Sequence, residues 1–69
     1  MAVKVAQEVF DGIEAVRQSG ATNMLAISEV ARVASIMGHE AAAQWVKVHA
    51  RDYARGIFVG WKVQKEEPA

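Results

Sequence analysis

The chain has 69 residues with eight basic and eight acidic side chains, and it contains no cysteine. A chain of this length forms one domain and buries only about 60% of the surface that its unfolded form exposes. The absence of cysteine excludes disulfides and thiolate metal sites, and the balanced charge excludes a strong overall attraction to nucleic acid or an anionic membrane.

The first helix is expected over residues 3–19. Large apolar residues recur there at helical spacing: Val5, Val9, Ile13 and Val16. Gly12 interrupts the pattern, and its missing side chain would allow another helix to approach closely. Gly20 follows the helix and suits the left-handed conformation that often ends one.

A connection and a second helix follow. Asn23 offers turn chemistry, and three large apolar residues in the connection predict that it folds inward: Met24, Leu25 and Ile27. Ser28 is the expected N-cap of a helix over residues 28–37, and Gly38 ends that helix. The apolar residues of this second helix lie on one face: Val30, Val33, Ala34 and Met37.

The third and longest helix is expected over residues 39–60. One side of it carries Ala42, Trp45, Val46, His49, Tyr53 and Gly56. The other side carries Glu40, Gln44, Lys47, Arg51 and Arg55. The predicted fold is therefore an all-α, three-helix bundle in which two shorter helices pack on a long C-terminal helix.

Residues 1–63 are predicted to form the single domain, and residues 64–69 a flexible C-terminal tail. The expected core consists of Val9, Ile13, Val16, Met24, Leu25, Val30, Val33, Met37, Trp45, Val46, His49 and Tyr53. No apolar run approaches the ~20 residues of a membrane span, and the N-terminus lacks the apolar stretch of a signal peptide. A cytoplasmic protein is expected.

Ile57, Phe58, Val59 and Trp61 predict a surface for self-association or partner docking. Four large apolar residues within five positions point all round a helix, so one internal face cannot bury them all. Phe and Trp are favoured interface anchors. Because a core this small rarely supplies more than roughly 3–5 kcal/mol, self-association is also an expected source of stability, with a dimer favoured.

A basic stripe of Lys47, Arg51 and Arg55 supports an alternative, nucleic-acid binding, with Lys62 as a further contact. The charge is uneven along the chain, since residues 1–46 sum to −2 and residues 47–69 to +2. Neutralising three phosphates would give a salt slope of only about −2.7. A solvated helix face is the more common role of three such charges.

Enzymatic chemistry is not expected. His49, Asp52 and Tyr53 form the only compact set of polar or titratable groups, and they lack the third or fourth ligand of a metal site. A structural histidine is the more common reading of such a set. No nucleophile motif and no phosphate-binding loop is present. We therefore predict no catalytic, cofactor-binding or metal-binding residues.

Residues 9–60 resemble a small uncharacterised family of bacteriophage and prophage proteins, classed as a domain of unknown function. The most specific part is the run from Arg17 through Ser19-Gly20 and Thr22 to Asn23-Met24. Further matching positions are Ile13, Val16, Val30, Ala34, Met37, Gly38, His49, Tyr53, Ile57 and Gly60. The resemblance implies a phage-encoded accessory protein in the host cytoplasm that binds a larger host or phage protein, as an inhibitor for example. It assigns no activity.

Overall fold

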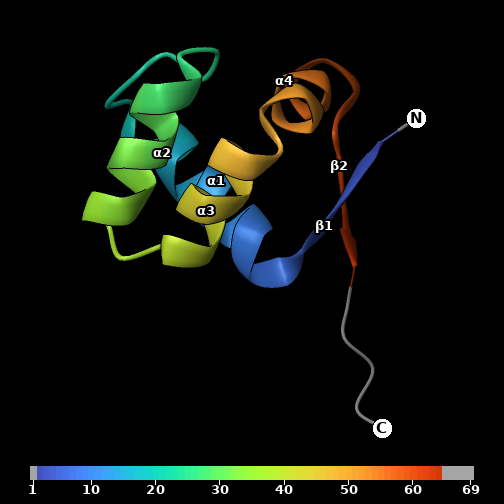
Figure 1. Ribbon diagram of the computed structural model, residues 1–69, viewed down its shortest axis with the longest axis horizontal. Helices are drawn as coiled ribbons and strands as arrows, with labels where there is room; N and C mark the ends of the chain where they lie inside the picture. Colours follow the sequence, from blue (N-terminus) through green and yellow to red (C-terminus); the bar gives the residue numbers. More distant parts are fainter. Residues whose placement is uncertain (1, 65–69) are drawn as a thin grey trace, which may run out of the picture.

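Among residues 2–64, which the computed structural model describes, the chain forms four helices and two short parallel strands. In chain order these are β1 (Val3–Ala6), α1 (Gln7–Ser19), α2 (Ile27–Ile36), α3 (Glu40–Val48), α4 (Ala50–Val59) and β2 (Trp61–Gln64) (Figure 1). The predicted all-α, three-helix bundle is therefore wrong in two places: the start of the first helix and the course of the last one.

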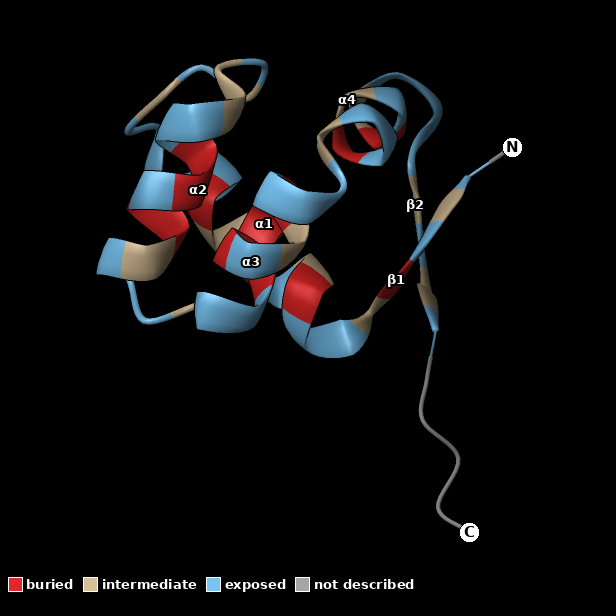
Figure 2. Ribbon diagram, in the orientation of Figure 1, coloured by how far each residue is buried: buried red, intermediate tan, exposed pale blue. Residues whose placement is uncertain are grey.

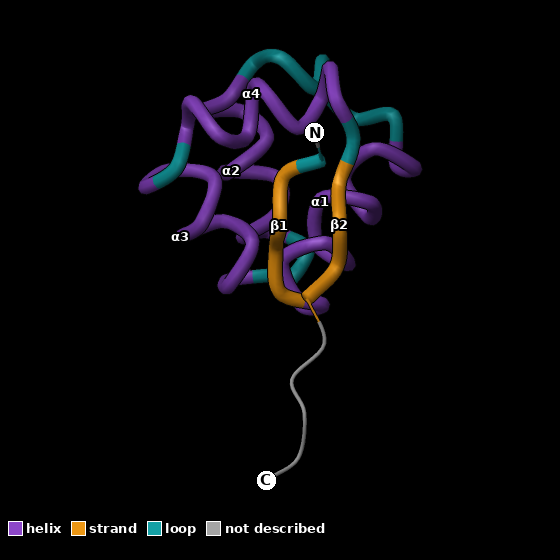
Figure 3. Tube along the Cα trace, turned by 90° about the vertical axis from the view of Figure 1, so that its right-hand side faces the viewer, coloured by secondary structure: helices purple, strands orange, loops and turns teal. Residues whose placement is uncertain are grey.

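The first helix begins at Gln7 because the residues before it form β1. Val5 is buried and Lys4 is exposed, as expected for a strand with one face against the core. β1 pairs in parallel with β2, with Val3 opposite Trp61 and Lys4 opposite Lys62. The two ends of the described chain therefore lie side by side (Figure 3), with the helices gathered on one side of them (Figure 1).

The predicted helix over residues 39–60 is two helices that meet at His49. The backbone of His49 has φ −115° and ψ 47°, outside the helical region. Its N–H donates to the carbonyl of Trp45, and its carbonyl accepts from the N–H of Tyr53, so this residue both ends α3 and begins α4. In Figure 1, α3 lies across the view whereas α4 is seen nearly end-on. The chain changes direction at His49, which turns Tyr53 and Gly56 toward their buried contacts.

Two glycines have the roles that the sequence predicts. A Cβ on Gly12 would lie 2.3 Å from the Cβ of Ala42 and 2.9 Å from that of His39. The start of α3 therefore lies so close to α1 that only glycine fits at this position. Gly20 ends α1 at φ 66°, and its N–H donates to the carbonyl of Arg17. Both predictions are confirmed.

The second helix lies close to its predicted position but is not capped by Ser28. Ala26 is the N-cap residue, and no side chain caps the helix. The turn before it is organised by Asn23, whose Oδ1 accepts the N–H of Leu25 at 2.8 Å. Leu25 is 49% exposed, whereas Met24 and Ile27 pack against the core. The connection therefore folds inward only in part.

The core runs through all four helices and reaches β1 (Figure 2). Its buried apolar residues are Val5, Val9, Ile13, Val16, Val30, Ala31, Val33, Ala34, Ala42, Ala43, Val46 and Tyr53. Of the predicted core, Met24 and Trp45 are partly buried, while Leu25, Met37 and His49 are exposed. Of the predicted tail, Gln64 is the last residue of β2 and residues 65–69 lie outside the described residues.

Candidate interaction surface

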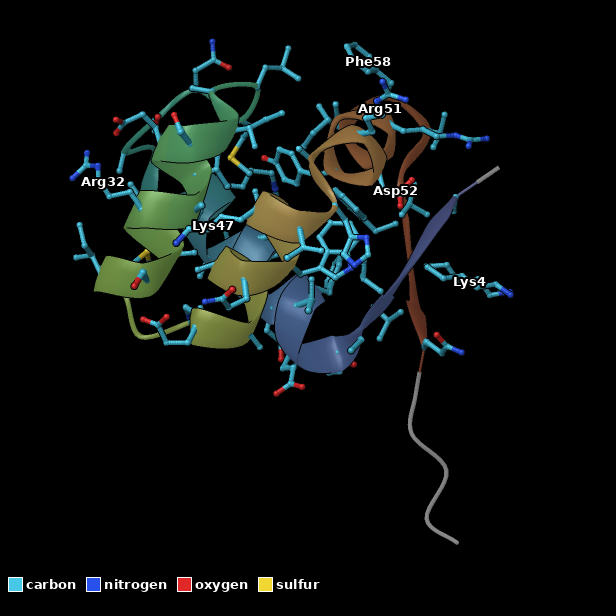
Figure 4. The ribbon with its side chains drawn as sticks, in the orientation of Figure 1. Lys4, Arg32, Lys47, Arg51, Asp52 and Phe58 are labelled. Carbon is cyan, nitrogen blue, oxygen red and sulfur yellow. The ribbon has the colours of Figure 1, made fainter. Side chains whose placement is uncertain are left out.

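Five residues of α4 are exposed: Arg51, Asp52, Arg55, Phe58 and Val59. We term Arg51, Arg55, Phe58 and Val59 the α4 face, because Arg55 lies four residues after Arg51 and is followed by Phe58 and Val59 at three and four. Phe58 is 76% exposed and Val59 42% exposed. In Figure 4, Phe58 and Arg51 point outward together from α4. The α4 face therefore combines a large aromatic ring with two cationic side chains.

Ile57 and Trp61, the other predicted interface residues, lie against the core. Both are partly buried and pack on the central cluster. The Trp61 ring covers Gly56 so closely that a Cβ there would lie 2.2 Å from a ring carbon. Of the three predicted interface residues, Phe58 alone is left largely in solvent, and the predicted role of all three in docking stays a prediction.

Trp61 belongs to an aromatic cluster that joins β2 to α3 and α4. Its ring centroid lies 5.8 Å from that of Trp45 in an edge-on arrangement, and 5.8 Å from that of Tyr53. The rings of Trp45 and His49 are 5.2 Å apart. Aromatic pairs at such distances contribute about 0.5–1.5 kcal/mol beyond their buried area. The cluster therefore holds β2 against α3 and α4.

The basic stripe predicted on one helix is divided between two. Lys47 lies on α3, whereas Arg51 and Arg55 lie on α4 beyond the break at His49. All three are exposed, and Figure 4 shows Lys47 and Arg51 pointing outward at separate places on the molecule. The fold thus keeps Arg51 and Arg55 together and separates Lys47 from them.

A second group of cations meets at the strands. Lys4 and Lys62, which we term the lysine pair, lie opposite one another in the parallel register, and both are exposed. A groove of about 480 Å³ borders Lys4 and is lined by Ala2, Val3, Lys4, Asp52 and Arg55. We term it the α4–β1 groove. Arg55 belongs to both the α4 face and this groove, so the two surfaces are continuous. Lys4 does not stand out in the sequence, because the apolar spacing predicts a helix over residues 3–19.

Among the described residues, the arginine–glutamate ion pairs lie away from these surfaces. Arg17 and Arg32 each hold the glutamate three residues before them, at 2.7 Å from Glu14 and 2.6 Å from Glu29. The Arg17 guanidinium, by donating hydrogen bonds to the carboxylate, lowers the pKa of Glu14. Within residues 2–64, no carboxylate lies within 4.0 Å of the cations of the α4 face, the lysine pair or Lys47.

His49, Asp52 and Tyr53 do not converge. The His49 Nδ1 lies 3.9 Å from an Asp52 oxygen, and both side chains are about half exposed. Tyr53 is buried on the other side, where its hydroxyl donates to the carbonyl of Met24 at 2.5 Å. In the described part of the chain, no three His, Asp or Glu side chains gather as metal ligands would.

A further groove of about 310 Å³ lies at the other end of the strands. It is lined by Ala6, Gln7, Glu8, Asp11 and Gln64, and Gln7 donates to Asp11 within it. Its titratable groups are acidic, in contrast with the α4–β1 groove. No helix in residues 2–64 is long and apolar enough to cross a membrane.

Residues 5–61 match the family described as domain of unknown function DUF5049. The match runs from the buried Val5 of β1 to Trp61 of β2, so it includes the helices and reaches both strands. No curated protein and no solved structure matches the chain significantly. The predicted resemblance to a family of unknown function is thus confirmed at that level. The chain belongs to the DUF5049 family, a domain of unknown function.

Proposed function

We propose that the chain is a non-enzymatic protein-binding module that docks on a larger protein through the α4 face, with Phe58 as its anchor. The observation that carries this proposal is the 76% exposure of Phe58 beside two exposed arginines. Aromatic and arginine side chains are enriched where protein interfaces bind most strongly. The proposal includes the phage or prophage origin that the resemblance implies, with the host cytoplasm as the place of action.

Capture from a nuclease-treated bacterial lysate tests this proposal with a matched pair of variants. Phe58→Glu places a charge on the α4 face, whereas Ile36→Glu places one at another exposed apolar residue, 70% exposed at the end of α2. We expect a discrete protein to be retained by the native chain and by Ile36→Glu. Its affinity for Phe58→Glu, measured with both proteins purified, should be at least about tenfold weaker. Equal binding to all three chains would contradict the proposal.

Self-association through the same face is part of the proposal, with a dimer favoured. A small exposed aromatic surface is removed from water when two copies meet, which would add to the stability of a small core. Sedimentation equilibrium at rising concentration should show a dimer for the native chain and for Ile36→Glu, and a monomer for Phe58→Glu. A native chain that stays monomeric at millimolar concentration would remove this part of the proposal.

Nucleic-acid binding is the second candidate, favoured by the lack of carboxylate partners around Arg51 and Arg55 within residues 2–64. It predicts that an oligonucleotide binds with a salt slope of about −1.8 for two phosphate contacts, made by Arg51 and Arg55. Arg51→Glu should abolish that binding, and Phe58→Glu should leave it largely intact. The opposite dependence would favour the protein-binding proposal.

A further inference from the structure

The fold brings Lys4, near one end of the described chain, beside two cations from near the other end, Arg55 and Lys62. Lys4 and Lys62 are direct neighbours across the two strands, and Arg55 reaches the same site from α4 on the far side of the α4–β1 groove. Like charges directly opposite one another in a sheet are destabilising. The arrangement therefore works against the stability of the isolated chain.

Within residues 2–64, no carboxylate forms an ion pair with Lys4, Lys62 or Arg55. Asp52 also lines the groove, with its carboxylate 3.9 Å from the His49 Nδ1 and more than 4.0 Å from the nitrogens of Lys4 and Arg55. Arg17 and Arg32, by contrast, are each held by a glutamate on their own helix. Because one acid faces three cations here, the region keeps a net positive charge that an external anion would stabilise.

The neighbouring surface shows which kind of anion fits. Phe58 and Val59 continue the cationic surface through Arg55, so the site offers apolar area and positive charge together. Nucleic acid fits less well, since the chain has no net charge to attract a polyanion. A protein segment that carries both acidic and apolar side chains matches both halves of the surface.

We propose that the α4–β1 groove and the lysine pair bind an acidic segment of the partner protein, with carboxylates at Lys4, Lys62 and Arg55 and an apolar side chain on Phe58. This inference rests on the proposed function, and it names the chemistry of the partner. Lys4 and Lys62 give the segment its charge preference, and Phe58 gives it an anchor.

Selection from a random 12-residue peptide library on the full native chain tests this inference. Enriched peptides are synthesised, and their affinities are measured by fluorescence anisotropy. The affinity of each peptide for the native chain is compared with its affinity for four variants: Lys4→Glu/Lys62→Glu, the neutral Lys4→Gln/Lys62→Gln, Phe58→Glu and Lys47→Glu. Lys47→Glu is the control, because it changes an exposed lysine outside the site. Circular dichroism checks that each variant folds.

We expect the enriched peptides to be rich in Asp and Glu and to contain a large apolar residue. Their affinity should fall at least about tenfold on Lys4→Glu/Lys62→Glu, by less on the Gln variant, and hardly at all on Lys47→Glu. Raising the salt concentration should weaken binding to the native chain, because the contacts are between charges near the surface.

Three results would overturn the inference. If the enriched peptides carry no excess of Asp and Glu and their binding depends on Phe58 alone, the proposed function holds but the acidic character of the partner is wrong. If no peptide is enriched and an oligonucleotide binds to the native chain but not to Lys4→Glu/Lys62→Glu, both the protein-binding proposal and the acidic segment are wrong. A native dimer that the same double variant separates would show that the cations meet the acidic groove around Glu8 and Asp11 of a second copy instead.

Discussion

At the scale of single residues, Tyr53 holds the connection between α1 and α2 onto α4 through its hydrogen bond to Met24. Burial raises the pKa of Tyr53 to about 12. The unfolded chain, with an ordinary phenol of pKa 10.0, ionises first as the pH rises, so the free energy of unfolding is fully retained below pH 10 and falls between pH 10 and 12. We expect a loss of about 2–3 kcal/mol over that range.

Urea unfolding at pH 9, 10, 11 and 12 measures this loss. Tyr53→Phe is the control, because it keeps the buried ring and removes the titrating group. The variant should start less stable at pH 9 and show a smaller decline than the native chain. Parallel declines of the two chains would show that Tyr53 ionises as easily in the folded chain as in the unfolded one.

Gly56 is the second decisive residue, because Trp61 covers it. An alanine there would place its Cβ 2.2–2.6 Å from three carbons of the Trp61 ring. We expect Gly56→Ala to lower the free energy of unfolding by about 1–3 kcal/mol, since the ring has to move and the gain in helix propensity is smaller. The indole N–H resonance of Trp61 should shift as well.

Gly12→Ala provides the comparison for that measurement. Its Cβ would meet Ala42 at the contact between α1 and α3, so it should also destabilise the chain. It should leave the Trp61 resonance nearly unchanged, because the strain lies elsewhere. A Gly56→Ala chain that matches the native one in stability and spectrum would contradict the tight packing of Trp61.

At the scale of elements, the sequence predicted the two helices with clear ends and missed the features set by tertiary contacts. Gly20 and Gly38 follow the ends of α1 and α2, as predicted. Both helices lie where the apolar spacing places them, except that α1 begins at Gln7 and not at residue 3. Val5 and Val9 are also four residues apart, so the spacing continues smoothly from strand into helix. Nothing local shows that residues 3–6 pair with residues 61–64 at the other end of the chain.

The break at His49 was equally invisible, because no glycine or proline marks it. The apolar spacing runs on through Trp45, His49 and Tyr53 as it would in one helix. The direction of α4 is set by contacts outside the helix: the Tyr53 bond to Met24 and the Trp61 ring on Gly56. Tertiary packing overrides local preference here, as it often does in short helices.

The lysine pair gives a prediction at this scale. Lys4→Glu replaces two like charges across the strands with an opposite pair, which should raise the free energy of unfolding by about 0.2–1 kcal/mol. Thermal and urea unfolding measure the change, and the gain should shrink in 1 M salt, where charges are screened within roughly 3 Å. Lys4→Glu is therefore expected to strengthen the fold while it weakens the proposed binding of acidic segments.

Two variants check that the gain comes from the pair. Lys47→Glu makes the same change in net charge on α3, away from the strands, and should alter stability by no more than about 0.5 kcal/mol. Lys4→Glu/Lys62→Glu restores a like-charged pair and should lose the gain. A Lys4→Glu chain less stable than the native one would show that the two side chains do not repel each other in the fold.

For the molecule as a whole, the candidate surface was only half visible in the sequence. Phe58 stood out because too many large apolar residues crowd the end of the last helix for all of them to be buried. The α4–β1 groove and the lysine pair could not be predicted, since they need Lys4 across from Arg55 and beside Lys62. Those positions meet only after the two ends of the described chain pair, which is a property of the complete fold.

That pairing makes the strands part of the single core rather than an attachment to it. Val5 of β1 is 2% exposed and belongs to the same buried cluster as Val9 and Ile13 of α1. We expect Val5→Ala to lower the free energy of unfolding by about 2 kcal/mol, since it removes buried apolar volume. Val48→Ala makes the same change at a position 71% exposed and should shift stability by no more than about 0.5 kcal/mol.

Two probes distinguish one cooperative unit from two. Far-UV circular dichroism follows the helices, and tryptophan fluorescence follows Trp45 and Trp61, whose rings join α3 to β2. If the strands share the core, both signals change at one urea concentration in the native chain, and Val5→Ala moves both midpoints equally. A fluorescence change that precedes the loss of helix would mean that β2 separates first. The lysine pair would then exist only in the fraction of molecules that keep their ends together, and a bound acidic segment would raise that fraction.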